Sequence, residues 1–122
     1  MGEANPKFKP GQDFTLNAGA TITGGQLLMV SNAADNTVIP TSGVVSGWLG
    51  VAAQDTASGE KVVVKRGGVQ WLISSGAITR GARVVPGAAG VVTTIGASDE
   101  DTAVGTALTT AASNRVLVAM DR

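Results

Sequence analysis

The hydrophobic residues of this chain fall in short runs that are separated by turn-forming residues. Leu27–Val30 follows Gly24-Gly25, and Val69–Ile73 follows Gly67-Gly68. Short apolar or alternating runs bounded by Gly, Pro, Asn and Ser are typical of strands. The predicted strands cover residues 14–16, 27–30, 37–40, 48–52, 61–65, 69–73, 83–85, 91–95, 102–107 and 115–120.

A single stretch, residues 107–113, could form a helical turn, and the adjacent Thr109 and Thr110 weaken that interpretation. Val, Ile and Thr are abundant elsewhere, the chain has 17 glycines, and only 15% of the residues are charged. β-branched residues suit a pleated sheet, and glycines mark turns and bulges. The pattern therefore predicts an all-β domain, either a small barrel or a sandwich.

The first residues differ from the rest in that they lack a strand pattern. Pro6 and Pro10 forbid a regular helix and restrict the residues before them to extended conformations. We expect residues 1–13 to form an extended arm and residues 14–122 to form a single β-rich domain. Phe8 lies between the two prolines, and it either folds back onto the core of its own domain or docks onto a partner.

Comparison of the chain with itself indicates an internal repeat. Residues 22–28 match residues 78–84 at an offset of 56, and several residues between 50 and 63 match residues between 105 and 118 at an offset of 55. Chance similarity in a sequence rich in Gly, Ala, Val and Thr is the alternative. If the repeat is real, the halves span about residues 14–66 and 67–122 and pack together, because neither half could bury its own face alone.

Composition narrows the possible functions. The chain has no cysteine, histidine or tyrosine, and its nine basic and nine acidic residues give a net charge of zero. The absence of cysteine excludes disulfides and thiolate chemistry, and the absence of histidine removes the commonest general base and metal ligand. A neutral chain is not typical of a free nucleic-acid binder. We therefore expect no enzyme activity and no cofactor.

The sequence also carries no membrane or export signal. No apolar run is long enough to span a bilayer, and the N-terminus lacks the pattern of a secretory signal. The expected compartment is the cytoplasm of the producing cell.

Three polar segments are candidate chemical sites. The acidic run at residues 99–101 could bind a hard cation, but the calcium-loop pattern is missing and a solvated loop is the favoured interpretation. Residues 65–68 (KRGG) could hold an anion, although a plain turn is favoured. Residues 74–76 (SSG) contain two serines, and the chain has no histidine to activate either one.

Trp48 and Trp71 are core residues or interface anchors, and the core is the default for both.

Several of these motifs together resemble the small capsid-decoration, or head cement, proteins of tailed bacteriophages. The resemblance covers about residues 8–120. It is carried by residues 50–64 (GVAAQDTASGEKVVV) with Gly68-Val69, the PGQD step at 10–13, the turns at 22–25 and 77–85, the step at 105–107 and the final strand at 115–118.

The resemblance implies a β-barrel or β-tulip-like domain, often a homotrimer, on the outer surface of the virion capsid. Such a protein would be made in the host cytoplasm and would stabilise the expanded head by bridging subunits of the major capsid protein, its partner, with no direct contact to nucleic acid or membrane. Lys7, Phe8, Lys9 and Pro10 of the arm are the expected contacts with the capsid or with a neighbouring copy. The alternatives are another phage structural module, such as a tail, fibre or self-assembling shell protein, and a small ligand-binding β module.

Overall fold

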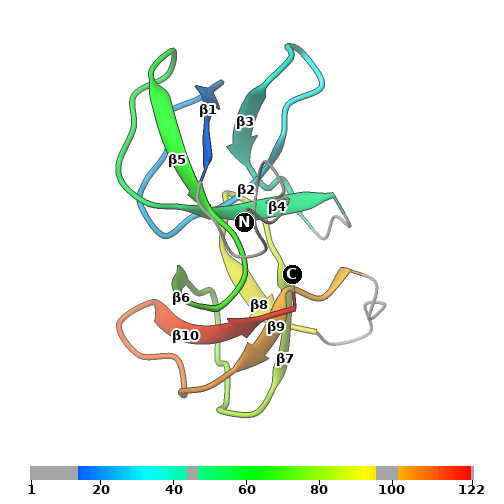
Figure 1. Cartoon of the computed structure of the whole chain (residues 1–122). Coiled ribbons are helices and arrows are strands. Elements are labelled where there is room, and N and C mark those ends of the chain that lie inside the picture. The colour runs from blue at the N-terminus through cyan, green and yellow to red at the C-terminus, as the bar shows by residue number, and fades with distance from the viewer. Residues whose placement is uncertain (1–13, 44–46, 96–101, 122) are drawn as a thin grey trace, which may run out of the picture.

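The computed structural model describes residues 14–43, 47–95 and 102–121, and its regular elements are ten short strands (Figure 1). They are β1 (Phe14–Ala18), β2 (Leu27–Val30), β3 (Thr37–Pro40), β4 (Trp48–Ala52), β5 (Lys61–Lys65), β6 (Val69–Ile73), β7 (Arg83–Pro86), β8 (Val92–Thr94), β9 (Gly105–Ala107) and β10 (Arg115–Met120). Strands β2 to β6 have the predicted bounds, and the all-β prediction is confirmed.

The first five strands form a closed barrel in the order β1-β3-β2-β4-β5. Strand β1 closes it by pairing with β5 in antiparallel fashion and with β3 in parallel fashion. Closure joins the two ends of the strand order, with β1 meeting β3 at Asn17 and Ala18. The barrel encloses its own small core, made of Ala18, Ile22, Leu28, Val38, Ala52, Val62 and Val64.

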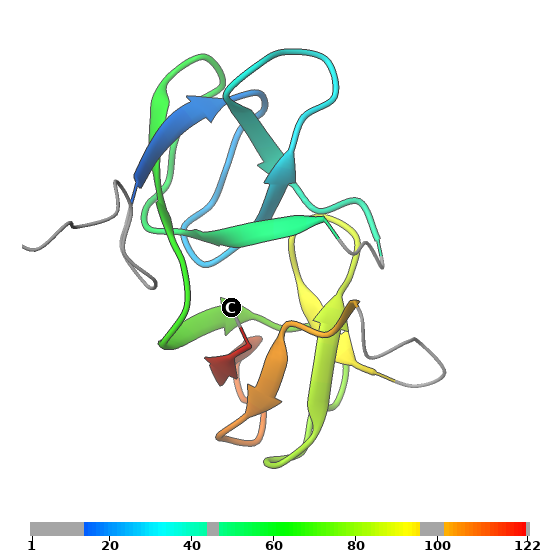
Figure 2. The same cartoon turned by 45° about the vertical axis from the view of Figure 1, so that its right-hand side comes forward.

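The last five strands form a second sheet in the order β6-β10-β9-β7-β8 (Figures 1 and 2). Read around the barrel from β1, the order is β1-β5-β4-β2-β3, so the second sheet repeats the barrel strand for strand. A parallel bridge between Ser74 and Val92 stands where β1 pairs with β3 in the barrel. The second sheet therefore has the strand order of the barrel, and its first and last strands meet at a single bridge.

The two halves also repeat individual hydrogen bonds. In each half the turn before the second strand is tied to the end of the fourth strand, and the same donors and acceptors recur at offsets of 56 and 55. The matched bonds are Gly25 N–H to Ala52 O (2.9 Å) with Gly81 N–H to Ala107 O (2.7 Å), and Ala52 N–H to Gln26 O (2.9 Å) with Ala107 N–H to Ala82 O (2.8 Å). These bonds support the proposed division of the domain into two repeat halves.

The predicted match of the closing strands is wrong by one residue. Ala52 pairs with Val64 and Ala107 pairs with Val118, so Val64 corresponds to Val118 at an offset of 54. The buried Val62 corresponds in the same way to the buried Val116. The loop before β10 is one residue shorter than the loop before β5, and the sequence match, which kept an offset of 55 through both loops, contained no gap there.

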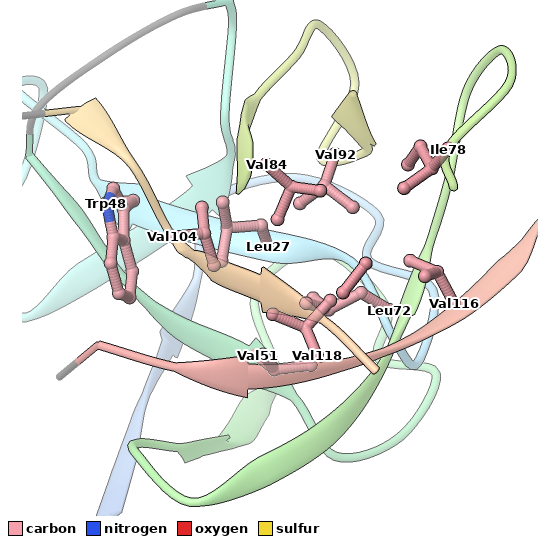
Figure 3. Close-up of a cluster of buried hydrophobic side chains, with 11 residues drawn as sticks. Leu27, Trp48, Val51, Leu72, Ile78, Val84, Val92, Val104, Val116 and Val118 are labelled. Carbon is pink, nitrogen blue, oxygen red and sulfur yellow. The ribbon is translucent and has the colours of Figure 1, made fainter. Parts of the chain in front are cut away.

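One large hydrophobic core joins the two halves (Figure 3). Leu27, Trp48 and Val51 of the first half point into the same cluster as the inner residues of the second half. The second-half members are Leu72, Ile78, Val84, Val92, Val104, Ala107, Val116 and Val118. Strands β2 and β4 thus bury one face inside the barrel and the other in this shared core.

The structure corrects the possible helical turn at residues 107–113. Ala107 ends β9, and the segment that follows is irregular. The Thr109 hydroxyl accepts a hydrogen bond from the backbone N–H of Leu117 (3.2 Å), and Ala111 donates to the Ile78 carbonyl (2.9 Å). These polar groups bond to neighbouring segments of the same chain and not within a helix.

The predicted arm, residues 1–13, lies outside the described residues.

Glycine is required where β9 pairs with β10. A Cβ built on Gly105 would overlap the carbonyl oxygen of Ala119, and one built on the equivalent Gly50 would lie 2.6 Å from the carbonyl oxygen of Lys65. We expect Gly105→Ala to lower the free energy of unfolding by about 3 kcal/mol, measured by urea denaturation, because the strands must separate. Gly47→Ala is the matched control, since its Cβ meets nothing within 4 Å; equal stability of the two variants would contradict this account.

The shared core predicts a single cooperative unfolding transition. Leu27→Ala should lower the stability of both halves together by about 3 kcal/mol, because Leu27 is fully buried in the cluster that joins them. Differential scanning calorimetry would show one transition that shifts as a whole, and Val30→Ala, at a half-exposed valine, would shift it little. Two separate transitions would show that the halves do not depend on the shared core.

Candidate functional site

The outer face of β6 and β10 carries apolar side chains that the rest of the described domain does not bury. Val69 and Trp71 are 53% and 54% exposed, and they pair across the sheet with Ala119 and Leu117. Because side chains alternate along a strand, these residues share the face opposite the buried Leu72. We call this surface, made of Val69, Trp71, Ile73, Leu117 and Ala119, the β6–β10 face.

The two tryptophans have different environments. Trp48 is 3% exposed and lies in the shared core, as predicted (Figure 3). Trp71 is exposed, so its default assignment to the core is wrong and the alternative of an interface anchor stands. The following residue, Leu72, points into the core. Because side chains alternate along a strand, Trp71 points to the opposite face of β6, which the core does not cover.

Strand β6 also presents an open backbone edge. Met120 N–H donates to Gly68 O (2.9 Å) and Ser74 N–H donates to Asn114 O (2.9 Å), which fixes residues 68, 70, 72 and 74 as those that bond to β10. Because the bonds of an antiparallel pair alternate, the backbone groups of Val69 and Trp71 point away from β10. Within the described residues no strand pairs with this side of β6 between these two positions.

In both halves the contact that closes the sheet covers only the C-terminal end of the first strand. In the barrel, β1 pairs with β3 through two residue pairs, whereas β6 meets β8 only through the bridge between Ser74 and Val92. Further along β6, Ile73 N–H donates to Gly25 O of the barrel (3.2 Å). The backbone of β6 is therefore tied down at its C-terminal end and open at its N-terminal end.

A cleft of about 410 Å³ lies between β6 and the barrel. Its walls come from the turn before β2, the end of β4 with the loop after it, and the facing residues of β5, β6 and β10. The lining residues are Gly24, Gly25, Val51, Ala52, Ala53, Gln54, Asp55, Lys65, Gln70, Trp71 and Arg115. The cleft thus lies between the two halves, with Trp71 and the open edge of β6 on the same side.

Charge in the cleft is unbalanced. The carboxylate of Asp55 accepts a hydrogen bond from Gly24 N–H (2.8 Å) and so holds the turn before β2. Lys65 and Arg115 have no ion pair with any residue in the described part of the chain, where the one ion pair joins Arg83 and Asp121. The cleft therefore offers two cationic side chains against one carboxylate that is already engaged.

The structure brings together few of the residues that the sequence singled out. Residues 65–68 form a bend in which Gly67 and Gly68 have positive φ (71° and 66°), and Lys65 of that segment reaches the cleft. Residues 74–76 lie at the partial closure of the second sheet. Lys7, Phe8, Lys9, Pro10 and the acidic run at 99–101 lie outside the described residues.

The described residues contain no cluster of three or more acidic side chains that could hold a metal ion. They also contain no helix with the length and hydrophobicity needed to cross a bilayer.

Fluorescence would test the two tryptophan environments. Trp48→Phe leaves the exposed Trp71 as the emitter, and we expect red-shifted emission that acrylamide quenches strongly. Trp71→Phe leaves the buried Trp48, and we expect blue-shifted emission that is weakly quenched. Trp71→Phe should also change stability by less than about 1 kcal/mol, because the side chain contributes little to the core. Equal quenching of the two variants would contradict the assignment.

Comparison with known proteins agrees with the fold. The crystal structure of the N base of the head fiber gp8.5 in bacteriophage phi29 is similar to this chain, with a TM-score of 0.71 and 20% sequence identity over 89% of this chain and 92% of that one. No match is found among curated protein sequences. The sequence profile of the phage cement proteins matches residues 7–122, almost the whole length. The chain belongs to the phage cement protein family.

Proposed function

We propose that this phage cement protein, a structural protein of the phage head, binds the outer surface of the expanded capsid and bridges subunits of the major capsid protein. The family match over residues 7–122 is the observation that carries the proposal. In this proposal the protein adds cohesion to the shell and catalyses no reaction. The lack of histidine and cysteine in the sequence supports a role in contact rather than in chemistry.

The architecture suits repeated, passive contact. A core shared by two halves gives a stiff body, so contacts on different sides of the molecule can hold neighbouring subunits at a fixed spacing. The exposed β6–β10 face and the cleft beside it supply a surface for one such contact. Many contacts of modest strength, repeated over a lattice, sum to strong attachment.

The N-terminal segment is the second proposed contact. Lys7, Phe8, Lys9 and Pro10 combine charge, an aromatic anchor and a residue that favours an extended backbone. We propose that they contact the capsid or a neighbouring copy, which would favour a homotrimer or a local cluster on the shell.

A fibre-associated module is the alternative that the fold favours. The similar solved structure is described as the base of a head fiber, and the likeness covers most of both chains. The two possibilities differ in what the chain does once it is attached: a cement protein stabilises the shell by itself, whereas a fibre base serves to hold further protein. Stability of the heads with and without the bound protein separates them.

Co-sedimentation with phage heads that lack the protein tests the function. We expect saturable binding to expanded heads, with a fixed number of copies per capsid subunit, and an increase in the temperature at which the heads release DNA, because each bridge must break before the shell opens. Unexpanded heads are the control. If the protein binds neither form, the proposed function is wrong, and binding without stabilisation would favour the fibre base.

Deletion of residues 1–11 tests the role of the arm. The truncated protein should keep the melting temperature of the full chain, because the described core contains none of these residues. Its affinity for expanded heads should fall by roughly tenfold or more, which corresponds to the loss of one well-buried aromatic contact. A variant with Phe8→Ala alone is the matched control for the anchor. Unchanged binding by both would show that the arm is not a contact.

A further inference from the structure

We propose that the open edge of β6 is an acceptor for a strand, and that its occupant is an extended, acidic segment of the capsid shell protein. The proposal deepens the function given above and rests on it. Three independent features of the cleft point to the same kind of partner: its backbone groups, its charges and its exposed tryptophan.

The backbone groups point to an extended chain. The N–H and C=O groups of Val69 and Trp71 face away from β10, on the side where Ile73 N–H bonds to Gly25 of the barrel, in the alternating geometry that a further strand would pair with. An extended peptide that adds to a sheet edge gains affinity through main-chain hydrogen bonds and specificity through side-chain pockets. The bond from Ile73 to Gly25 marks the end of this edge, so the acceptor is short and the strand that adds to it has a defined stop.

The charges point to an acidic partner. Lys65 and Arg115 both line the cleft, and Arg115 lies opposite Ile73 on β10. Neither cation has an ion pair within the described residues, and the Asp55 carboxylate is engaged by Gly24. Carboxylates on an added strand would meet both cations, and complementary charge would set its register.

The same charges disfavour the chain's own arm as the occupant. The segment of the arm around Phe8 has lysines at positions 7 and 9, and the arm's two acidic residues, Glu3 and Asp13, each lie five positions away from Phe8. Placing this segment beside Lys65 and Arg115 would bring like charges together in a cleft partly shielded from water. Trp71 offers an aromatic surface to an apolar side chain of any strand that binds. It therefore adds affinity without favouring the arm over another strand.

Proline at position 69 tests the backbone part of the proposal. Val69 is the first residue of an edge strand, and its N–H points away from β10, so Val69→Pro removes an outward donor without removing a bond of the sheet. Val69→Thr keeps the donor and the branched shape and is the matched control. We expect Val69→Pro to weaken binding to expanded heads by roughly tenfold, from the lost hydrogen bond and the blocked approach, at an unchanged melting temperature.

Charge reversal tests the acidic character of the partner. Lys65→Glu combined with Arg115→Glu should weaken head binding by at least about tenfold, because two attractive contacts become repulsive. Lys61→Glu combined with Arg80→Glu changes net charge equally at exposed positions away from the cleft. If the wild-type protein binds heads and both the proline and the cleft-charge variants bind equally well, the acceptor is disproved while decoration stands.

Hydrogen exchange measured by mass spectrometry identifies the occupant. We expect the segment containing Val69 and Trp71 to exchange fast in the free protein and slowly on the head. Slow exchange in the free, full-length protein that becomes fast when residues 1–11 are deleted would show that the chain's own arm fills the edge, which overturns the proposal. Protection that grows with protein concentration in step with oligomer formation would identify a second copy and overturn it equally.

A peptide titration keeps the acceptor testable if the wild-type protein binds no head and the proposed function fails. The probe is a short peptide of alternating valine and glutamate with blocked ends, and the control peptide has lysine in place of glutamate. Shifts of the Val69 and Trp71 amide resonances with the acidic peptide alone, absent in Val69→Pro, would support an acidic strand acceptor. No shift with either peptide, or equal shifts with both, would overturn it.

Discussion

The burial of Leu27, Trp48 and Val51 against the second half is the interaction on which the rest of the structure depends. In the first half, β2 and β4 are apolar on both faces, one inside the barrel and one in the shared core. The positions in the second half that correspond to Leu27 and Val51 are Arg83 and Thr106, which bond to each other (Arg83 Nη1 to Thr106 Oγ1, 2.9 Å) and, through the arginine, to Asp121. Because these positions are polar in the second half, no third repeat could pack there as the second half packs on the first. Terminal repeats in longer repeat proteins carry a polar outer face for the same reason.

The same union of halves creates the cleft. Its residues come from the turn before β2, the loop after β4 and the facing strands of the second half, which meet only when the shared core has formed. A change that loosens the core would therefore alter the cleft as well. The open edge of β6 follows from the topology itself, because in each half the closing contact covers only the C-terminal end of the first strand. The duplicated topology thus supplies the open edge, and the union of the halves supplies the cleft beside it.

Most of the strands could be predicted from the sequence, and the candidate site could not. Turn residues such as Gly67-Gly68 mark strand ends locally, so the bounds of β5 and β6 follow from neighbouring residues. The outward position of Trp71 depends on which face of β6 the core fills, and three consecutive apolar residues at 71–73 leave that choice open to tertiary structure. The sequence does contain one indication of the site, which is that β6 has apolar residues on both faces. A sheet with a core on one side buries only one of them, so an apolar residue on the other face indicates a surface that a partner covers.

An unpaired edge beside an exposed apolar face is a hazard for a protein of zero net charge, because two copies could pair edge to edge. Lys65 and Arg115 lie beside this edge. Two copies that approached through it would bring four cations together, which opposes indiscriminate pairing. The same two cations would attract an acidic strand. One pair of side chains can therefore both protect the edge in the free protein and select what finally covers it, so that the open side of the second sheet is kept for a partner of opposite charge.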